Sequence, residues 1–454
     1  MDAFQIKQVG RGIERFLAEF SDCFGRCDTE SYLAVYVRGQ NSNLPRKSVE
    51  PMALQAGIPP RSLQAFLSLL NWDEERVVDR VQQIVMRDHG HRWAIGLVDE
   101  TGSPKKGEHT AGVQHQWCGR TGKVDHCVVS VHLGYTAGGF HCLLDSDLFL
   151  PKSWANDPAK RKEAGIPQDA VHRSKPEMAL AQIRRALANG VRVAAWTFDE
   201  HYGQSYAFLD GLDGLGQTYV AEVPSTFTGW AVYPKLVYRI TSQERPPGGR
   251  KRPVPRLAGT AAKASEVRNL LRHSPAFRAQ PWTAIHLKEG EKGPLVREVK
   301  VICFWMQREG LPTRAHWLMA ARNPEEPETI KFFVSNAPGG TPLEWLTYVG
   351  YSRWPIERCF EEDKDELGFD HFEVRGWKAI HRHMYLTQVS HLYLNKARAQ
   401  LMAEERVQDE AGVFSLPGRR RRSPYVSGGE PDGEPDSRGL GRMVPGRLAS
   451  AFCS

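Results

Sequence analysis

Residues 351–364 read Tyr-Ser-Arg-Trp-Pro-Ile-Glu-Arg-Cys-Phe-Glu-Glu-Asp-Lys, and this stretch decides the fold. Pro355 has no N–H to donate and a fixed φ, so it suits the first turn of a helix and would break a helix interior. Gly368 lacks a Cβ and readily adopts the left-handed conformation that ends helices. The sequence therefore predicts a helix that begins near Pro355 and runs to Glu366 or Leu367.

Charged residues share one face of this predicted helix, and Arg353 stands in the turn just before it. At positions i, i+4 and i+7, that face carries Glu357, Glu361 and Lys364. The apolar face, which we expect to pack inward, carries Ile356, Phe360 and Leu367. A single charged helix is most often a solvated face with ion pairs, so the rest of the chain must show whether a carboxylate here is functional.

Length and composition indicate a soluble globular protein. The chain has 454 residues, 41% of them hydrophobic, so we expect two or three domains and a large core. No segment approaches the roughly 18 uninterrupted apolar residues that suggest a membrane span, and the N-terminus lacks the pattern of a signal peptide. The sequence therefore predicts a cytoplasmic protein with no membrane partner.

The net charge indicates the kind of partner, and the cysteine spacing indicates the state of the thiols. A formal net charge of +7 and a pI near 8.9 favour a polyanionic partner. The eight cysteines are scattered. Cys23 and Cys27 lie close together, but no second Cys or His pair follows at the spacing of a zinc site, so we expect buried free thiols.

Residues 1–90 are predicted to form a helical N-terminal domain that binds DNA. Apolar residues recur with helical spacing in 13–20 and 77–85, and two short helices are expected at 51–57 and 61–70. Two helices on a tight glycine-containing turn are compatible with a helix-turn-helix. An ordinary helical bundle explains the same pattern equally well.

Residues 91–223 are predicted to form the first part of an α/β core. An apolar strand at 93–98 ends on Asp99, and three further strands follow as an antiparallel meander. The capping box Ser174-Lys-Pro-Glu177 then opens a helix, and a second apolar strand, 191–198, ends on Asp199. A strand–helix–strand order makes the later strand parallel to the sheet, and if it lies beside the strand that ends on Asp99, both carboxylates meet at one sheet edge.

The remaining chain is divided into three predicted parts. Residues 224–335 contain a Pro- and Gly-rich loop and several strand candidates, which indicates a mainly β insertion. Residues 336–404 return to helix, beginning with a second expected capping box at Thr341-Pro-Leu-Glu344, and complete the core. Residues 405–454 are predicted to be a disordered basic tail.

Three carboxylates therefore stand out: Asp99, Asp199 and Glu357. Hard oxygen ligands that converge on one point suit Mg²⁺, which leaves coordination positions open for phosphate oxygens. Two such ions about 4 Å apart support in-line attack on a phosphodiester. A strand-end aspartate is often only a turn former or a helix cap, so it is the conjunction of the three acids that points to catalysis.

These residues resemble the DDE transposases of bacterial insertion sequences. The resemblance rests on Val98-Asp-Glu-Thr-Gly-Ser-Pro-Lys-Lys-Gly-Glu-His-Thr-Ala-Gly-Val113, on Thr197-Phe-Asp-Glu-His-Tyr-Gly203, and on Arg353-x3-Glu357-x6-Lys364. More narrowly, they are similar to the subclass with a Tyr-x2-Arg-x3-Glu-x6-Lys signature and a β insertion before the glutamate. The match covers roughly residues 30–400.

The resemblance implies an RNase H-like mixed sheet flanked by helices, with Asp99, Asp199 and Glu357 as the catalytic triad that holds two Mg²⁺ ions, for which Mn²⁺ substitutes. It also implies that Arg353 and Lys364 contact DNA phosphates. The sequence departs from the signature at its tyrosine, because Gly350 occupies the expected position and Tyr351 follows one place later. The spacing to Arg353 and Lys364 favours Glu357 over Glu361 as the third acid.

The expected function is that of a transposase that cleaves the ends of its element and joins the 3′-hydroxyl to target DNA. Its partners would be double-stranded DNA, as terminal inverted repeats and target, and further copies of the chain in a dimer or higher oligomer within a bacterial nucleoid. Lys105, Lys106, Arg250 to Arg252 and Tyr351 are the further DNA-binding candidates. The alternatives are an RNase H-like nuclease without strand transfer and an inactive transposase-derived DNA-binding protein.

Overall fold

The structure is a computed structural model that describes residues 12–239, 254–290 and 293–413. The chain divides into two units, Met1–Leu394 and Asn395–Ser454, and the first contains the whole sheet. No helix in the described ranges is both long enough and apolar enough to cross a membrane. The predicted tail from 405 lies partly within the last helix, which runs to Val413, and otherwise outside the described residues, as do Arg250 to Arg252.

Helices precede the first strand, as predicted. They are η1 (Ala18–Cys23), α2 (Cys27–Gln40), α3 (Val49–Gln55), α4 (Pro60–Ser68) and α5 (Glu74–His89). The short pair α3 and α4 is present, and the turn between them contains Gly57 at φ 69°, a conformation that glycine adopts without strain. The Asp73 side chain caps α5 by accepting a hydrogen bond from the Arg76 N–H, which fixes where that helix begins.

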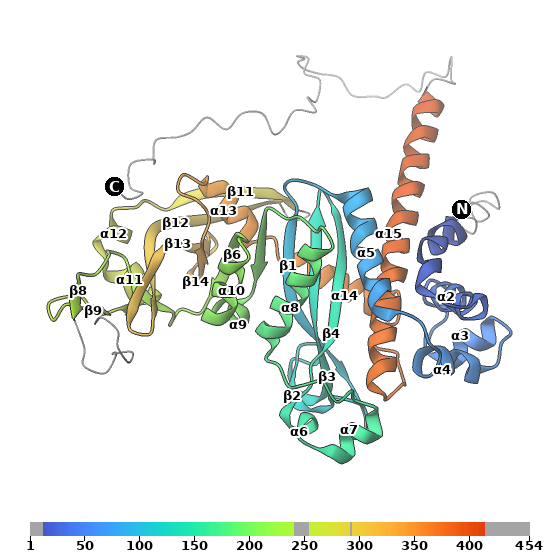
Figure 1. The fold of residues 1–454 in the computed structure, drawn as a ribbon. Coiled ribbons are helices and arrows are strands. Elements are labelled where there is room, and N and C mark those ends of the chain that lie inside the picture. Colours follow the sequence, from blue (N-terminus) through green and yellow to red (C-terminus); the bar gives the residue numbers. More distant parts are fainter. Residues whose placement is uncertain (1–11, 240–253, 291–292, 414–454) are drawn as a thin grey trace. The chain divides into compact units, whose positions relative to one another are not determined.

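The core is a mixed sheet whose strands β1, β5 and β6 run parallel (Figure 1). Its first six strands are β1 (Ile95–Pro104), β2 (Gln114–Cys118), β3 (Lys123–Ala137), β4 (Phe140–Leu148), β5 (Ala195–Phe198) and β6 (Tyr219–Val223). β2, β3 and β4 are antiparallel, as predicted, but β1 to β4 are not a simple meander, because β3 pairs with each of the other three and lies directly beside β1. This mixed sheet with helices against it agrees with the predicted RNase H-like α/β class.

The close pairing of β1 with β5 depends on a glycine. Gly96 faces Trp196 in the parallel ladder, and a Cβ at Gly96 would lie 2.1 Å from the Trp196 ring. A side chain at this position would therefore separate the two strands. The pairing ends at Val98 and Phe198, so the residues that follow on each strand, Asp99 and Asp199, start from the same level of the sheet.

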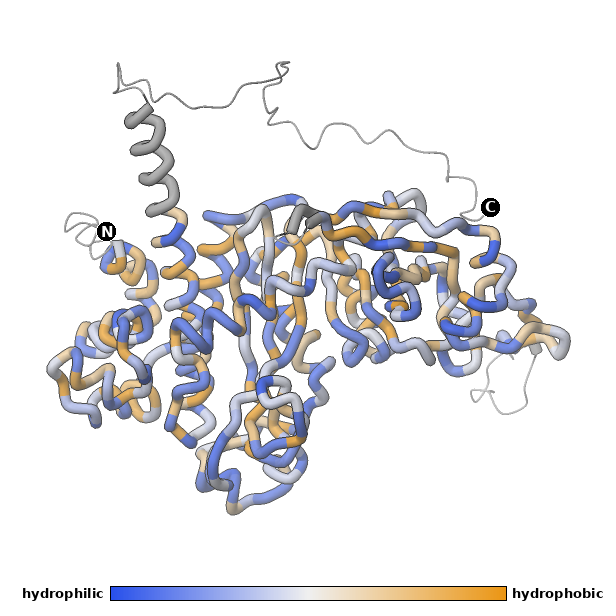
Figure 2. The backbone as a smooth tube through the Cα atoms, turned by 180° about the vertical axis from the view of Figure 1, so that it is seen from behind, coloured by the Kyte–Doolittle hydropathy of each residue, from blue (hydrophilic) through white to orange (hydrophobic). Residues whose placement is uncertain are grey.

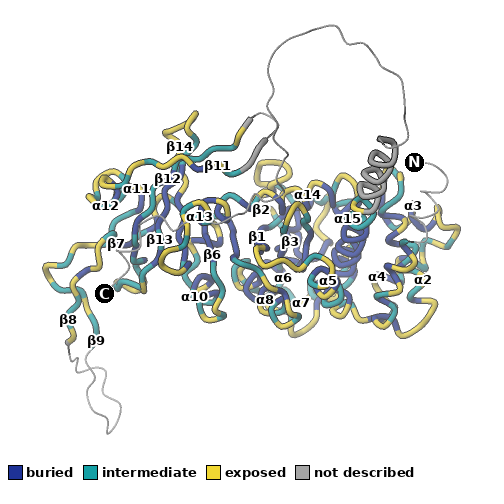
Figure 3. The backbone as a smooth tube through the Cα atoms, turned by 90° about the horizontal axis from the view of Figure 1, so that it is seen from above, coloured by how far each residue is buried: buried dark blue, intermediate teal, exposed yellow. Residues whose placement is uncertain are grey.

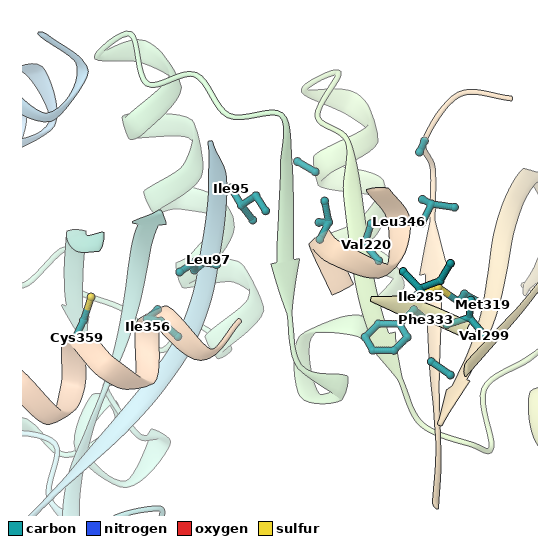
Figure 4. Packing of buried hydrophobic residues seen from close by; sticks show 14 of the residues in the cluster. Ile95, Leu97, Val220, Ile285, Val299, Met319, Phe333, Leu346, Ile356 and Cys359 are labelled. Carbon is teal, nitrogen blue, oxygen red and sulfur yellow. The ribbon is translucent and has the colours of Figure 1, made fainter. Parts of the chain in front are cut away.

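The predicted insertion continues the core sheet. Its strands are β7 (Thr228–Trp230), β8 (Leu236–Arg239), β9 (Val254–Leu257), β10 (Ser265–Glu266), β11 (Thr283–Gly290), β12 (Gly293–Arg308), β13 (Leu311–Asn323) and β14 (Glu326–Ser335). Of these, β8 and β9 pair with each other in a separate two-stranded sheet. β14 pairs antiparallel with β6, which gives the order β10-β7-β12-β13-β14-β6-β5-β1-β3-β2 among the described residues. One hydrophobic cluster accordingly runs from Leu97 to Val299 and Met319 (Figure 4).

Helices cover this sheet and connect its strands. They are α6 (Lys152–Ala155), α7 (Pro158–Ala164), α8 (Lys175–Ala188), α9 (Glu200–Gly203), α10 (Tyr206–Gly214), α11 (Val267–His273), α12 (Pro275–Arg278), α13 (Leu343–Gly350), α14 (Trp354–Asp365) and α15 (Trp377–Val413). The first half of α15 is buried (Figure 3). Long hydrophobic stretches mark the central strands (Figure 2).

Three local predictions differ from the structure. β1 does not end on Asp99 but continues to Pro104, because β3 is long enough to pair with it as far as Cys127. β5 begins at Ala195 and is shorter than predicted. The second capping box does not form, because the Thr341 hydroxyl donates to the Pro338 carbonyl and Pro342 is the N-cap. By contrast, the box at Ser174 and the helix of residues 354–365 are confirmed.

Because Asp145 is buried in the core, we expect the stability of the protein to depend on pH. Burial raises the pKa of Asp145 to about 7, with Arg185 opposing that rise. The folded chain then binds more protons than the unfolded chain between about pH 4 and 7, so this contribution is lost as pH rises, by at most about 4 kcal/mol. In the Asp145→Asn variant, the free energy of unfolding should no longer show this fall between about pH 4 and 7. Urea unfolding at several pH values measures it. The exposed Asp169→Asn is the control, and an unchanged slope in Asp145→Asn would contradict the prediction.

Candidate active site

Strand β1 sends its two acids to opposite faces of the sheet. Side chains alternate along a strand, so Asp99 lies on the face of Leu97 and Thr101, where α14 packs, and Glu100 lies on the other. On that other face, Glu100 forms an ion pair with Lys175 at the start of α8 and accepts a hydrogen bond of 2.9 Å from the Tyr202 hydroxyl. Asp99 is therefore the β1 carboxylate that faces the predicted catalytic helix.

Asp199 lies just beyond the end of β5 and caps α9. Its Oδ1 accepts hydrogen bonds from the backbone N–H groups of His201, at 3.0 Å, and Tyr202, at 3.4 Å. This capping is the structural role that a strand-end aspartate often has. The bonds hold the Asp199 side chain at the level where the β1–β5 ladder ends, and thus beside Asp99.

Arg353 joins Asp99 to Glu357. Its guanidinium bonds Asp99 Oδ2 through Nη1 and lies 2.8 Å from Glu357 Oε1 through Nη2. Glu357 lies in the first turn of α14, and its side chain is 52% exposed, whereas that of Asp99 is 11% exposed. Ile356, beside it, packs next to Leu97 and fixes this end of the helix on β1 (Figure 4). The two carboxylates therefore lie on either side of one cation.

The electrostatics of the site favour positive charge. Burial raises the pKa of Asp99 to about 7, Arg353 opposes this rise, and the charge of Asp199 adds to it. The pKa of Asp199 is also raised, first by burial, and again Arg353 acts against the change. Both acids are buried, and the ionised form of a buried carboxylate is stabilised by a nearby cation.

The donor set fits a hard divalent cation. Asp99, Asp199 and Glu357 offer only carboxylate oxygens, which Mg²⁺ and Mn²⁺ prefer. Arg353 already brings positive charge between two of them. Arg353 thus contacts Asp99 and Glu357 directly and acts on Asp199 through its charge, and these three acids are the residues that would hold a metal.

Lys364 and Glu361 leave the helix in different directions. Lys364 Nζ donates a 2.5 Å hydrogen bond to the Thr101 hydroxyl, two residues beyond Asp99 on the same face of β1. Glu361 is 67% exposed and lies 4.0 Å from Arg358 of the same helix. Lys364 is therefore near the acids, and Glu361 belongs to the solvated side of α14.

The other predicted DNA contacts are in different environments. Tyr351 is half-buried at the end of α13, where its ring packs on Phe333 and under the Arg297 guanidinium, and burial raises its pKa to about 12. Lys105 Nζ lies 2.9 Å from the Phe372 carbonyl, and burial lowers its pKa to about 8. Lys106 is exposed in the loop after β1.

The sequence did not single out several residues that lie next to this site. Glu100, Lys175 and Tyr202 form a bonded group against the far side of β1, and Thr101 receives Lys364. A signal was present, since Glu100 and Tyr202 both stand in the runs that also contain the predicted aspartates. Their pairing depends on strand alternation across two segments, which a motif alone does not reveal.

Comparison with known proteins gives two matches. The family model described as "DDE superfamily endonuclease" matches residues 19–294. The chain is also 30% identical, over 349 residues, to a protein of Microchaete diplosiphon named "Probable transposase for insertion sequence element IS701", and the match covers 75% of each chain. The residues that the family model matches include Asp99 and Asp199.

Proposed function

Because this chain belongs to the DDE transposases of bacterial insertion sequences, we propose that it cleaves the ends of its own element and joins the freed 3′-hydroxyl to target DNA. The observation that carries this proposal is the shared contact of Arg353 with Asp99 and Glu357, beside Asp199. Asp99 and Glu357 are 258 residues apart in sequence, yet both contact Arg353 near the end of the parallel strand pair. This is the place where the family resemblance predicts the catalytic acids.

DDE superfamily endonucleases use divalent metals. We propose two Mg²⁺ ions here, replaceable by Mn²⁺, held by Asp99, Asp199 and Glu357. When bound, such ions activate the attacking oxygen and stabilise the leaving one. Asp99 is anchored by its strand, Asp199 by its capping bonds and Glu357 by α14, so the chain supplies three ligands from rigid elements.

Arg353 and Lys364 have two roles in this proposal. In the chain without DNA, Arg353 neutralises Asp99 and Glu357, and Lys364 is held by Thr101. Both are long cations beside the acids, so they are placed to bind phosphates of the strand being cut. The neighbouring Tyr351 would then support this region through its packing on Phe333, and Arg297 above its ring would add positive charge.

The proposal assigns recognition of the terminal inverted repeats to the helices that precede β1. It also assigns assembly of at least two copies on DNA, because two ends must be held together during one reaction. The favourable net charge of +7 supports a DNA partner.

A strand-transfer assay with pre-cut element ends tests this function. The transposase should yield joined products with Mg²⁺ or Mn²⁺, whereas an RNase H-like nuclease would cleave and yield none. An inactive derivative would bind DNA in a salt-dependent manner and neither nick nor join it. Failure to join pre-cut ends, by a chain that binds them, would refute the proposal.

Two adjacent lysines give a matched test of DNA contact. Lys106 is exposed, whereas Lys105 points to backbone carbonyls. Lys106→Ala should reduce the slope of log K against log salt by about 0.9, as expected for one lost phosphate contact on duplex DNA. Lys105→Ala should leave that slope nearly unchanged. Equal slopes for wild type and Lys106→Ala would remove Lys106 from the DNA-binding surface.

A further inference from the structure

A group of metal-binding side chains lies on the side of α14 away from Glu357. It comprises His141 from β4, Cys359 from α14 and His391 from α15, and their ligand atoms all lie within 4.8 Å of one another. Cys359 is fully buried, the His391 side chain is 0% exposed, and that of His141 is 17% exposed. The three residues come from distant parts of the sequence, so their grouping results from tertiary packing.

Glu362 adds a fourth donor, one turn beyond Cys359. Its Oε2 lies 3.5 Å from Nε2 of His141 and 3.5 Å from Nε2 of His391. Its Oε1 lies 3.4 Å from Nε of Arg358, so the carboxylate is held with its other oxygen toward the two histidines. The cluster thus combines two imidazole nitrogens, one sulfur and one carboxylate oxygen.

Asp363 orients one of the histidines. Its Oδ1 lies 2.6 Å from Nδ1 of His391, and its side chain is 2% exposed. With Asp363 ionised, its carboxylate accepts a hydrogen bond from Nδ1–H of His391, which leaves the lone pair of Nε2 toward His141 and Glu362. A histidine that donates its second N–H to a carboxylate is the usual arrangement around protein-bound metals.

We propose that His141, Cys359, Glu362 and His391 bind one Zn²⁺ ion in tetrahedral geometry. A mixed set of nitrogen, sulfur and oxygen donors selects zinc over magnesium or calcium, which prefer oxygen alone. With metal–ligand bonds of about 2.0–2.3 Å, the donors would draw together to roughly 3.5 Å from one another. All four positions are filled by the protein, as in zinc sites that stabilise structure.

This site would hold α14 in place from the side opposite Glu357. Cys359 and Glu362 belong to α14, His141 to β4 and His391 to α15, so one ion would join three elements. Residues two apart on a helix point to different sides, which separates Cys359 from the half-exposed Glu357. The zinc would therefore hold the helix that carries Glu357 without occupying the carboxylate site.

Cobalt spectroscopy of the full chain tests the site without relying on its activity. The purified protein is stripped with a chelator and titrated with Co²⁺ alone. One equivalent should give the intense visible absorption of tetrahedral Co²⁺ and a thiolate-to-cobalt charge-transfer band, and Zn²⁺, but not excess Mg²⁺, should abolish both. A folded wild-type chain without these bands would overturn the proposal.

Variants identify the ligands. Cys359→Ser should lose the charge-transfer band, whereas Cys27→Ser, which removes an exposed thiol, should keep it. Asp363→Asn preserves an acceptor for His391 and should weaken Zn²⁺ affinity by about 10–100-fold with the band retained. Should Cys359→Ser fail to fold, His141→Gln at the partly exposed edge of the cluster should still reduce the affinity. A band that survives in Cys359→Ser and vanishes in Cys27→Ser would contradict the assignment.

Discussion

The substitution Glu357→Gln is expected to reduce metal-dependent strand cleavage by at least about 10³-fold, since a lost metal ligand removes several kcal/mol of transition-state stabilisation. The variant should still fold, because Glu357 is half-exposed and an amide of the same shape can occupy the first turn of α14. Cleavage of a labelled element end with Mg²⁺ or Mn²⁺ measures the effect, and circular dichroism checks the fold.

Glu361 offers a matched control for that substitution. It lies one turn further along α14, is 67% exposed and contacts Arg358 rather than Arg353. Glu361→Gln should therefore cleave at nearly the wild-type rate. If Glu357→Gln remained active and Glu361→Gln did not, the third acid of the site would be Glu361.

The substitution Arg382→Met is expected to lower the free energy of unfolding by about 3–5 kcal/mol. Arg382 of α15 is fully buried, and its guanidinium donates to the carbonyls of Phe66, Leu70 and Trp72 and to the carboxylate of Glu74. Methionine keeps much of the volume but leaves those acceptors without their donor in a buried place. Urea unfolding at constant pH measures the loss.

Lys378 provides the comparison, because it lies on the same helix and approaches the same acid. Its Nζ is 3.8 Å from Glu74 Oε1, and its side chain is 43% exposed. Lys378→Met should cost less than about 1 kcal/mol, as is usual for an exposed ion pair. Equal losses in the two variants would show that burial of Arg382 does not determine its contribution.

Much of the fold could be predicted from short-range signals. The box at Ser174, the proline at 355 and the glycine at 368 each determine a helix end locally, so α8 and α14 lie close to where they were expected. The apolar strands before Asp99 and Asp199 also predicted the parallel pairing that brings these acids together, because that inference needs only strand order and handedness.

The remaining features depend on partners far away in sequence. Gly102-Ser-Pro104 has the composition of a turn, yet it is a strand because β3 pairs with it. Arg353 was predicted to contact DNA phosphates. Its bonds to Asp99 and Glu357 could not be predicted, because they depend on how α14 packs on β1. The cysteines gave no zinc-site spacing because the proposed ligands come from β4, α14 and α15.

The antiparallel pairing of β6 with β14 has a consequence for the segment between them. Val223 and Phe332 face each other in the ladder, so the chain leaves the parallel core strands and returns to them at one point, as at the base of a hairpin. The cost of closing a loop grows only slowly with its length, by about 0.6 kcal/mol for each doubling. The length of the segment between these residues can thus vary at little entropic cost to the pairing of β6 with β14.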